Sequence, residues 1–377
     1  MTPLVRVVEA ALGPAAHIRV VVSGVSDPVR LRSTWSSSGA TVEDIDGRLH
    51  ATTTVEALAR AAGRSLEAEE ARALDRSLRE AVAAWLGPAP EVPLADRPLP
   101  TGAHPLVMGV VNVTPDSFSD GGLTYGGRKP HPQTAVGHAL HLLDEGADLL
   151  DVGGESTRPG ADPVSEADEL RRVIPVVEAL HGRAVISIDT TKRTVARAAL
   201  DAGAAIVNDV SGASDPALLD VVADTGAAYV LMHARGRPKD MRSLAVYDDV
   251  VAEVYEFLAE GLRRCAEAGI LTGRILVDPG LGFAKRPEHN VALLRALRQF
   301  RGLGRPVVIG ASRKSFLGVL LGEADTAGRL EGSLASAAVA VDAGVAVIRA
   351  HDVGPTARLT RVAQALSRRT DDWREGE

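Results

Sequence analysis

The chain has 377 residues, of which 45% are apolar and 24% are charged, a composition that indicates a folded globular protein and argues against disorder or a collagen-like chain. Its net charge of -7 argues against a nucleic-acid partner, which needs a basic surface, and the single Cys265 excludes an intramolecular disulfide and a cysteine-based zinc site. No run approaches the ~18 apolar residues of a membrane-spanning helix and residues 1–10 lack the pattern of a secretory signal, so we predict a cytoplasmic protein with no membrane partner.

Residues 1–86 predict a small α+β domain. Thr53 and Glu56 have the spacing of a capping box, which starts a helix that Gly63 is expected to end. A second helix is predicted over residues 65–86, because its apolar side chains recur on one face. This domain contains no catalytic constellation, so we interpret it as a structural or interaction module of unknown role. The alternative is that it covers part of an active site.

Residues 87–105 predict a linker. Proline fixes φ and removes a backbone donor, which excludes a helix or a central strand in a segment so rich in it. Its prolines are Pro88, Pro90, Pro93, Pro98, Pro100 and Pro105. The linker separates the first domain from residues 106–377, and at ~150 residues per domain the chain length also suggests two domains.

Residues 106–377 alternate short apolar runs with longer amphipathic segments of helical period. The eight runs are residues 106–111, 148–152, 184–188, 205–207, 228–232, 275–277, 307–309 and 345–348. Eight such units in ~250 residues predict a (β/α)8 TIM barrel of the α/β class. The alternative is an open doubly wound sheet, but no Gly-x-Gly-x-x-Gly turn opens the first unit.

Polar side chains follow the predicted strands, at the barrel end where such folds place catalytic groups. Asp189, Asn208 and Asp278 suit a flat heterocycle with N–H donors, because a buried carboxylate selects strongly for a partner that meets it. A second set is cationic and lies near glycine-rich loops, whose amides bind anions, so it suits a phosphate or a diphosphate. Its members are Arg158, Arg313, Lys314, Arg349 and His351.

Two loops at the predicted barrel mouth are candidate lids. Residues 114–122 are rich in turn-forming residues and carry two carboxylates and Phe118. Residues 154–160 are bounded by glycines. Long loops with glycine at their ends often close over a bound substrate.

Several of these residues also have a plainer interpretation. Asp189 has the position of a helix N-cap, because the chain from residue 190 onward looks helical. Arg349 and His351 have an alternative as ion-pair partners of Asp352. His233, after the fifth strand, fits a structural role and a site role equally well.

Five segments, in order along the chain, resemble the signatures of the dihydropteroate synthase family. They are NVTPDSFSDGG at residues 112–122, DVGGESTRPG at 151–160, DPGLGFAK at 278–285, SRKS at 312–315 and RAHDV at 349–353. The resemblance implies a transferase that joins 6-hydroxymethyl-7,8-dihydropterin diphosphate to para-aminobenzoate, making 7,8-dihydropteroate and diphosphate in folate biosynthesis. It also implies a homodimer whose interface lies on the helices after strands six to eight, and competition of sulfonamides with the aminobenzoate.

The resemblance implies a role for each matching position. The pterin ring would be held by Asp189, Asn208, Asp278 and Lys314, in a pocket lined by Met232 and Phe283. Asn112 would bind Mg²⁺ and would hold the diphosphate together with Thr157, Arg349 and His351. The aminobenzoate site would be framed by Phe118, Arg158, Pro159, Lys314 and Ser315, and a cationic intermediate would be stabilised by Asp120. The expected catalytic residues are therefore Asp120, Asp189, Asp278 and Lys314. Diphosphate would leave before the amine attacks, because Mg²⁺ and cationic donors neutralise its developing charge.

The sequence departs from the family pattern in three places. Arg235 and Arg237 add charge after the fifth strand, Ala350 stands where a larger valine is common, and the first 100 residues lie outside the pattern. Two other functions stay open. A pterin-dependent methyltransferase domain shares the barrel and its pterin contacts, but it would not need the loop at residues 114–122 or the SRKS motif. A non-catalytic pterin-binding paralogue is the second alternative, and the additional N-terminal domain keeps it open.

Overall fold

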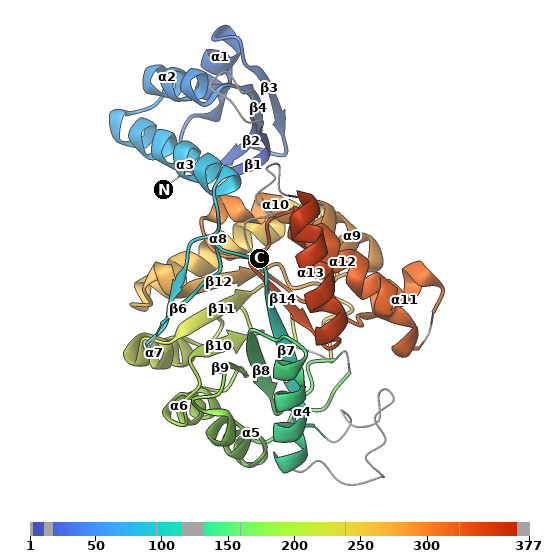
Figure 1. Cartoon of the computed structure of the whole chain (residues 1–377). Coiled ribbons are helices and arrows are strands. Elements are labelled where there is room, and N and C mark those ends of the chain that lie inside the picture. Colours follow the sequence, from blue (N-terminus) through green and yellow to red (C-terminus); the bar gives the residue numbers. More distant parts are fainter. Residues whose placement is uncertain are drawn as a thin grey trace. The chain divides into compact units, whose positions relative to one another are not determined.

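A computed structural model describes residues 3–10, 18–95, 97–114, 132–158, 160–237, 239–323 and 325–367 (Figure 1). Two compact units make up the chain: residues 1–89 with residues 296–305, and residues 90–295 with residues 306–377. The domain boundaries expected at residues 86 and 105 stay predictions. Within the described ranges, no helix is long and apolar enough to cross a bilayer.

The smaller unit is an α+β fold, as the sequence predicts. Its elements are β1 (Leu4–Ala10), β2 (Ile18–Ser23), α1 (Pro28–Ser37), β3 (Thr41–Ile45), β4 (Arg48–Thr53), α2 (Val55–Ser65) and α3 (Ala68–Leu86). The strands form an antiparallel sheet in the order β1-β2-β4-β3. Trp35, Leu58 and Leu74 are fully buried in its core, and the Trp35 indole donates to the Leu58 carbonyl at 3.0 Å.

Two details of this unit differ from the prediction. The N-cap of α2 is Thr54, whose hydroxyl accepts from the Ala57 amide at 3.3 Å, because Thr53 is still the last residue of β4. The helix continues through Gly63 to Ser65. A glycine costs a helix only about 1 kcal/mol relative to alanine, and packing of the buried face of α2 outweighs that cost.

The smaller unit also contains a segment from much later in the chain. Residues 296–305 form α10 (Leu297–Phe300) and the 3-10 helix η3 (Arg301–Leu303). From the sequence this stretch is expected only to belong to the segment between the apolar runs at 275–277 and 307–309 of the barrel. The side chains of Leu297 and Phe300 are fully buried. Arg6 donates to the Gln299 side chain at 3.3 Å. The core of this unit is therefore built from two distant parts of the sequence.

The larger unit is the predicted barrel. Its strands are β7 (Leu106–Asn112), β8 (Leu149–Gly153), β9 (Val185–Asp189), β10 (Ile206–Asp209), β11 (Ala228–Met232), β12 (Ile275–Asp278), β13 (Val308–Ile309) and β14 (Val347–Ala350). They form one parallel sheet in the order β12-β11-β10-β9-β8-β7-β14-β13. A parallel bridge between Val277 and Val307 joins its two ends, so the sheet closes.

Helices surround this sheet (Figure 1). They are α4 (Pro132–Asp144), α5 (Glu166–Leu180), α6 (Arg193–Asp201), α7 (Pro216–Thr225), α8 (Val250–Glu267), α9 (Pro287–Arg295), α11 (Ser315–Leu321), α12 (Leu330–Asp342) and α13 (Val353–Ser367), with short 3-10 helices η2 (Thr272–Arg274) and η4 (Ala327–Arg329). The proline-rich segment contains a small antiparallel ladder of β5 (Val92–Pro93) and β6 (Pro98–Leu99).

The strand register brings the carboxyl ends of the strands to one edge. Asn112 pairs with Gly153, Gly153 with Asp189, and Asp189 with Asn208. Met232 pairs with Asp278 on the far side of the barrel. Paired residues of parallel strands point to the same face of the sheet. The polar members of these pairs, which are Asn112, Asp189, Asn208 and Asp278, therefore converge at the barrel mouth.

Candidate active site

Arg349 connects three strands at the centre of the barrel. From β14 its Nε lies 2.6 Å from Asp151 Oδ2 on β8, and its Nη2 lies 3.0 Å from Asp189 Oδ2 on β9. Asn208 on β10 donates to the same Asp151 oxygen at 3.0 Å. Charge-assisted bonds of this kind hold side chains in fixed geometry. Four strands thus present one connected polar cluster.

Two of the plainer interpretations are wrong. Asp189 does not cap a helix, since α6 begins at Arg193 with Lys192 at the N-cap and the Asp189 carboxylate faces Arg349 instead. Arg349 does not pair with Asp352, which forms its ion pair with Arg313. The reason is that Arg349 lies within a strand and points into the barrel, whereas Asp352 lies beyond the strand end.

Asp151 is a site residue that sequence reasoning missed. It is completely buried, and its Oδ1 has no hydrogen-bond partner among the described residues. A carboxylate inside an apolar strand was the available signal, because Asp151 shares the inward parity of Gly153. The free oxygen of a buried carboxylate is costly, so it favours a bound group with an N–H or O–H donor.

The two central carboxylates repel each other electrostatically. Burial, followed by the charge of Asp151, raises the pKa of Asp189 to about 7. Burial also raises the pKa of Asp278. Arg349 opposes the shift at Asp189. The site therefore favours a ligand that supplies additional positive charge or N–H donors to these carboxylates.

A second cluster lies on the loop after β12. Asp278 accepts from the Gly280 amide at 2.7 Å, and Lys314 Nζ donates to the Leu281 carbonyl and lies 4.5 Å from the centre of the Phe283 ring. Burial lowers the pKa of Lys314 to about 8. A Cβ at residue 280 would lie 2.0 Å from the His233 carbonyl oxygen, so this turn requires glycine. A carboxylate, an aromatic ring and an ammonium group thus form one wall of the barrel mouth.

Lys285 supports this wall and was also missed by sequence reasoning. Its buried Nζ lies 2.9 Å from His233 Nδ1, 2.8 Å from the Gly280 carbonyl and 3.0 Å from the Phe283 carbonyl. Burial and then the charge of Lys285 lower the pKa of His233 to about 2, so the imidazole is neutral and Nδ1 accepts. His233 is 1% exposed and packs edge-on against Phe257. These contacts favour its structural role.

Arg235 supports the same loop from outside instead of adding a free cation to the mouth. Its Nη2 pairs with Glu253 at 2.6 Å, and its guanidinium lies 4.0 Å above the ring of Tyr247. The Tyr247 hydroxyl donates to the Ala284 carbonyl at 3.0 Å. The departure from the family pattern at this position is therefore accommodated by local pairing.

The loop after β8 carries Thr157, which is half-buried, and Arg158, which is exposed. Lys192 anchors its base by pairing with Glu155 and with the buried Glu169, and Glu169 accepts from the Thr190 hydroxyl at 2.7 Å. The loop is thereby connected to the strand that ends in Asp189.

His351 and Asn112 lie at two further strand ends. The His351 amide and Nδ1 both lie 3.1 Å from Ser312 Oγ, and burial, with the charge of Arg349, lowers the pKa of His351 to about 3. Asn112 is half-buried at the end of β7, Met232 is buried at the end of β11, and Ser315 is the first residue of α11.

Three of the predicted site residues lie outside the described residues: Phe118, Asp120 and Pro159. The candidate lid at residues 114–122 lies outside them too, except for residue 114.

A protein cage for a metal is not present in the described ranges, where no group of three or more His, Cys, Asp or Glu is arranged to hold an ion. Mg²⁺ does not require one, because it commonly keeps several waters and binds substrate phosphates with one or two protein oxygens. The half-buried Asn112 at the barrel mouth fits that mode.

Comparison with known proteins gives consistent results. A family model described as pterin binding enzyme matches residues 108–351. The dihydropteroate synthase of Escherichia coli K12 is 47% identical over 267 residues, covering 70% of this chain and 92% of the relative.

Solved structures match over the same region. The Yersinia pestis dihydropteroate synthase in complex with a sulfonamide drug is 41% identical with a TM-score of 0.69, covering 73% of this chain and 98% of that one. The Xanthomonas albilineans dihydropteroate synthase with 4-aminobenzoic acid is 46% identical with a TM-score of 0.68, covering 74% and 98%.

The contacts of Lys285 predict a large loss of stability on substitution. Lys285→Met removes the donor to His233 Nδ1 and to the Phe283 carbonyl, while the Gly280 carbonyl keeps its bond from the Phe283 amide at 3.2 Å. Each acceptor left without a partner costs about 1–3 kcal/mol. We expect the free energy of unfolding, measured in urea, to fall by at least about 2 kcal/mol. Lys239→Met, which removes only an exposed pair with Asp162, is the matched control and should leave it unchanged. Equal behaviour of the two variants would contradict this role of Lys285.

Proposed function

The chain belongs to the dihydropteroate synthase family of pterin-binding enzymes, and we propose that it condenses 6-hydroxymethyl-7,8-dihydropterin diphosphate with para-aminobenzoate to give 7,8-dihydropteroate and diphosphate. The observation that carries this proposal is the connected cluster of Asp151, Asp189, Asn208 and Arg349 at the barrel mouth. The cluster offers carboxylate and amide groups to a heterocycle, and the Arg349 guanidinium lies beside these groups.

In this proposal the pterin ring binds between the two clusters. Asp189, Asn208 and Asp278 meet its N–H and amino groups, and the free oxygen of Asp151 can accept another. Lys314 donates to a ring acceptor, while Met232 and Phe283 pack on the ring. Such a set rejects analogues without the matching donors, because the buried carboxylates would then stay unpaired.

The diphosphate would be held by the Arg349 guanidinium and by the uncharged side chains of Asn112, Thr157 and His351. Asn112 would also hold Mg²⁺, which supplies charge neutralisation to the departing diphosphate. Cleavage of the C–O bond sends its electron pair to diphosphate and leaves a methylene cation spread over the pterin. Asp189 and Asp278 would stabilise that charge, and Asp120 would do so as well.

The aminobenzoate nitrogen then attacks the methylene carbon, forms the C–N bond and loses a proton. Lys314 and Ser315 would frame this substrate together with Phe118, Arg158 and Pro159. No enzyme nucleophile is required, which is consistent with the burial of Cys265. A sulfonamide would compete for the same position.

Diphosphate release from the pterin substrate tests the function. We expect release to require Mg²⁺, to yield 7,8-dihydropteroate with para-aminobenzoate, and to be inhibited competitively by a sulfonamide. Asn112→Ala should raise the Mg²⁺ concentration needed for half-maximal rate about tenfold or more, since one ligand is lost. Tight pterin binding without release would contradict catalysis and favour a binding paralogue.

The raised pKa of Asp189 predicts a pH dependence of pterin binding. Below about pH 7 Asp189 is protonated and loses its charge, so binding of 6-hydroxymethyl-7,8-dihydropterin should weaken about tenfold per pH unit. Fluorescence titration without diphosphate avoids ionisation of the leaving group. Asp189→Asn should bind weakly with no such dependence, and the exposed Asp325→Asn should keep the wild-type profile. A flat wild-type profile would contradict the assignment.

We also propose a homodimer through the helices that follow β13 and β14. Exposed apolar side chains gather there: Val319, Leu320 and Leu321 on α11, Val339 on α12, and Val362 and Leu366 on α13. Sedimentation should give a dimer for the wild type and a monomer for Leu320→Asp, because a charge in an apolar interface is costly. Leu271→Asp, at a similarly exposed leucine outside these helices, should stay dimeric. A monomeric wild type would exclude the proposal.

A further inference from the structure

Arg313 has an unusual backbone conformation beside the active-site lysine. Its φ is +58°, in the left-handed region that side-chain-bearing residues rarely adopt. Such a conformation is unfavourable and persists only where surrounding contacts hold it. The residue stands between Ser312, which contacts His351, and Lys314, which belongs to one wall of the barrel mouth.

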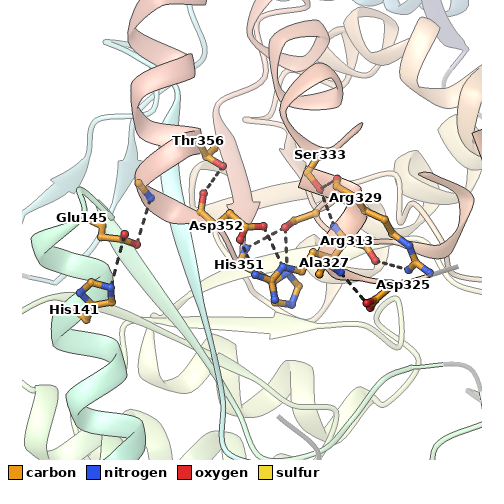
Figure 2. Close-up of polar contacts among 12 residues, drawn as sticks. His141, Glu145, Arg313, Asp325, Ala327, Arg329, Ser333, His351, Asp352 and Thr356 are labelled. Carbon is orange, nitrogen blue, oxygen red and sulfur yellow. Dashed lines mark hydrogen bonds and ion pairs between the residues drawn. The ribbon is translucent and has the colours of Figure 1, made fainter. Parts of the chain in front are cut away.

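Contacts from η4, from α12 and from the loop between β14 and α13 hold Arg313 in place (Figure 2). Its guanidinium forms a two-pronged pair with Asp352, at 2.6 Å from Nη2 to Oδ1 and 3.1 Å from Nε to Oδ2. Its amide donates to Ser333 Oγ at 3.0 Å, and its carbonyl accepts from Arg329 Nη1 at 2.9 Å. Both the side chain and the backbone of Arg313 are therefore engaged by the protein itself.

Asp352 is itself fixed at the start of α13. Its carbonyl accepts from the Thr356 amide at 3.1 Å and from the Thr356 hydroxyl at 2.7 Å. Asp352 also follows His351 directly, and the His351 amide donates to Ser312. The loops after β13 and β14 are thus joined at two points, Ser312 with His351 and Arg313 with Asp352.

We propose that Arg313 and Asp352 are positioning residues for the amine substrate. In this proposal the Arg313 guanidinium is engaged by Asp352 and acts on the loop, in place of serving as a free cation of the cationic half. It holds the loop at residues 312–315 in its left-handed turn. That turn sets the direction of Lys314 and the start of α11 at Ser315. This inference rests on the proposed function and deepens it.

The proposal predicts a split between the two substrates. Three of the four proposed pterin contacts, Asp189, Asn208 and Asp278, come from strands that the pair does not touch. Only Lys314 lies on the loop, so pterin affinity should fall much less than the use of para-aminobenzoate. Ser315 and Lys314 come from the loop that the pair holds, so use of para-aminobenzoate should suffer. A purely structural role would instead lower stability and both activities together.

The test compares Asp352→Asn, Arg313→Met and the double variant with wild type. We expect each single variant to raise KM for para-aminobenzoate about tenfold or more, with pterin binding changed less than about threefold. The double variant should be no worse than the single variants, because both remove one interaction. Arg313→Gly relieves the backbone strain but deletes the pair, so it should keep the melting temperature and still show the raised KM.

Glu145→Gln is the matched control. Glu145 accepts from the Gly354 amide at 3.4 Å in the first turn of the same helix and does not contact residues 312–315. It should retain the wild-type KM. Wild-type turnover with unchanged KM in Asp352→Asn, or additive effects in the double variant, would overturn the positioning role. Absence of turnover in the wild type would instead remove the proposed function.

Discussion

The barrel mouth depends on the bridge from Arg349 to Asp151 and Asp189. Two buried carboxylates on neighbouring strands repel each other, and without a cation between them one would be protonated. Arg349 suits this position because its planar guanidinium bonds two carboxylates at once in a fixed geometry. The bridge also leaves one Asp151 oxygen without a hydrogen-bond partner among the described residues, so that oxygen can accept from a donor.

The loops around this bridge share one principle of construction. Each is held by a cation whose donors point at acceptors of the protein rather than at the cavity: Lys285 under the loop after β12, Lys192 under the loop after β8, and Arg313 at the loop after β13. Removing one partner of such a buried bond leaves the other unsatisfied, which is why these contacts rigidify the loops. Because these basic side chains bond to the protein itself, only a few polar side chains are left to face a substrate.

The smaller unit is built from two separate stretches of the chain. Its core takes in Leu297 and Phe300 from the segment between α9 and β13, so its fold is not complete within the first 89 residues. Arg298 lies 5.5 Å from the centre of the Trp85 ring, and Arg301 donates to the Gly87 carbonyl.

Sequence alone determined the eight apolar runs, their parallel order and the polar residues at their ends. These features depend on local periodicity and on motifs read along the chain. Asp189, Asn208, Asp278, Lys314 and Arg349 were all found in this way. The extent of α2, its N-cap, and the assignment of residues 296–305 could not be found, because packing against distant segments decided them.

The sequence also could not predict which side chains form ion pairs or hydrogen bonds between different strands of the barrel. Asp151 looks like any residue of a buried strand until the register turns it toward Arg349, and Asp352 is adjacent to His351 in sequence but pairs with Arg313. Nothing local distinguishes a lysine that lines the barrel mouth, such as Lys314, from one that supports it, such as Lys285. The sequence determined which groups are present at the barrel mouth, and only the tertiary structure decided which of them are already paired, because pairing depends on distances between strands that are far apart in the chain.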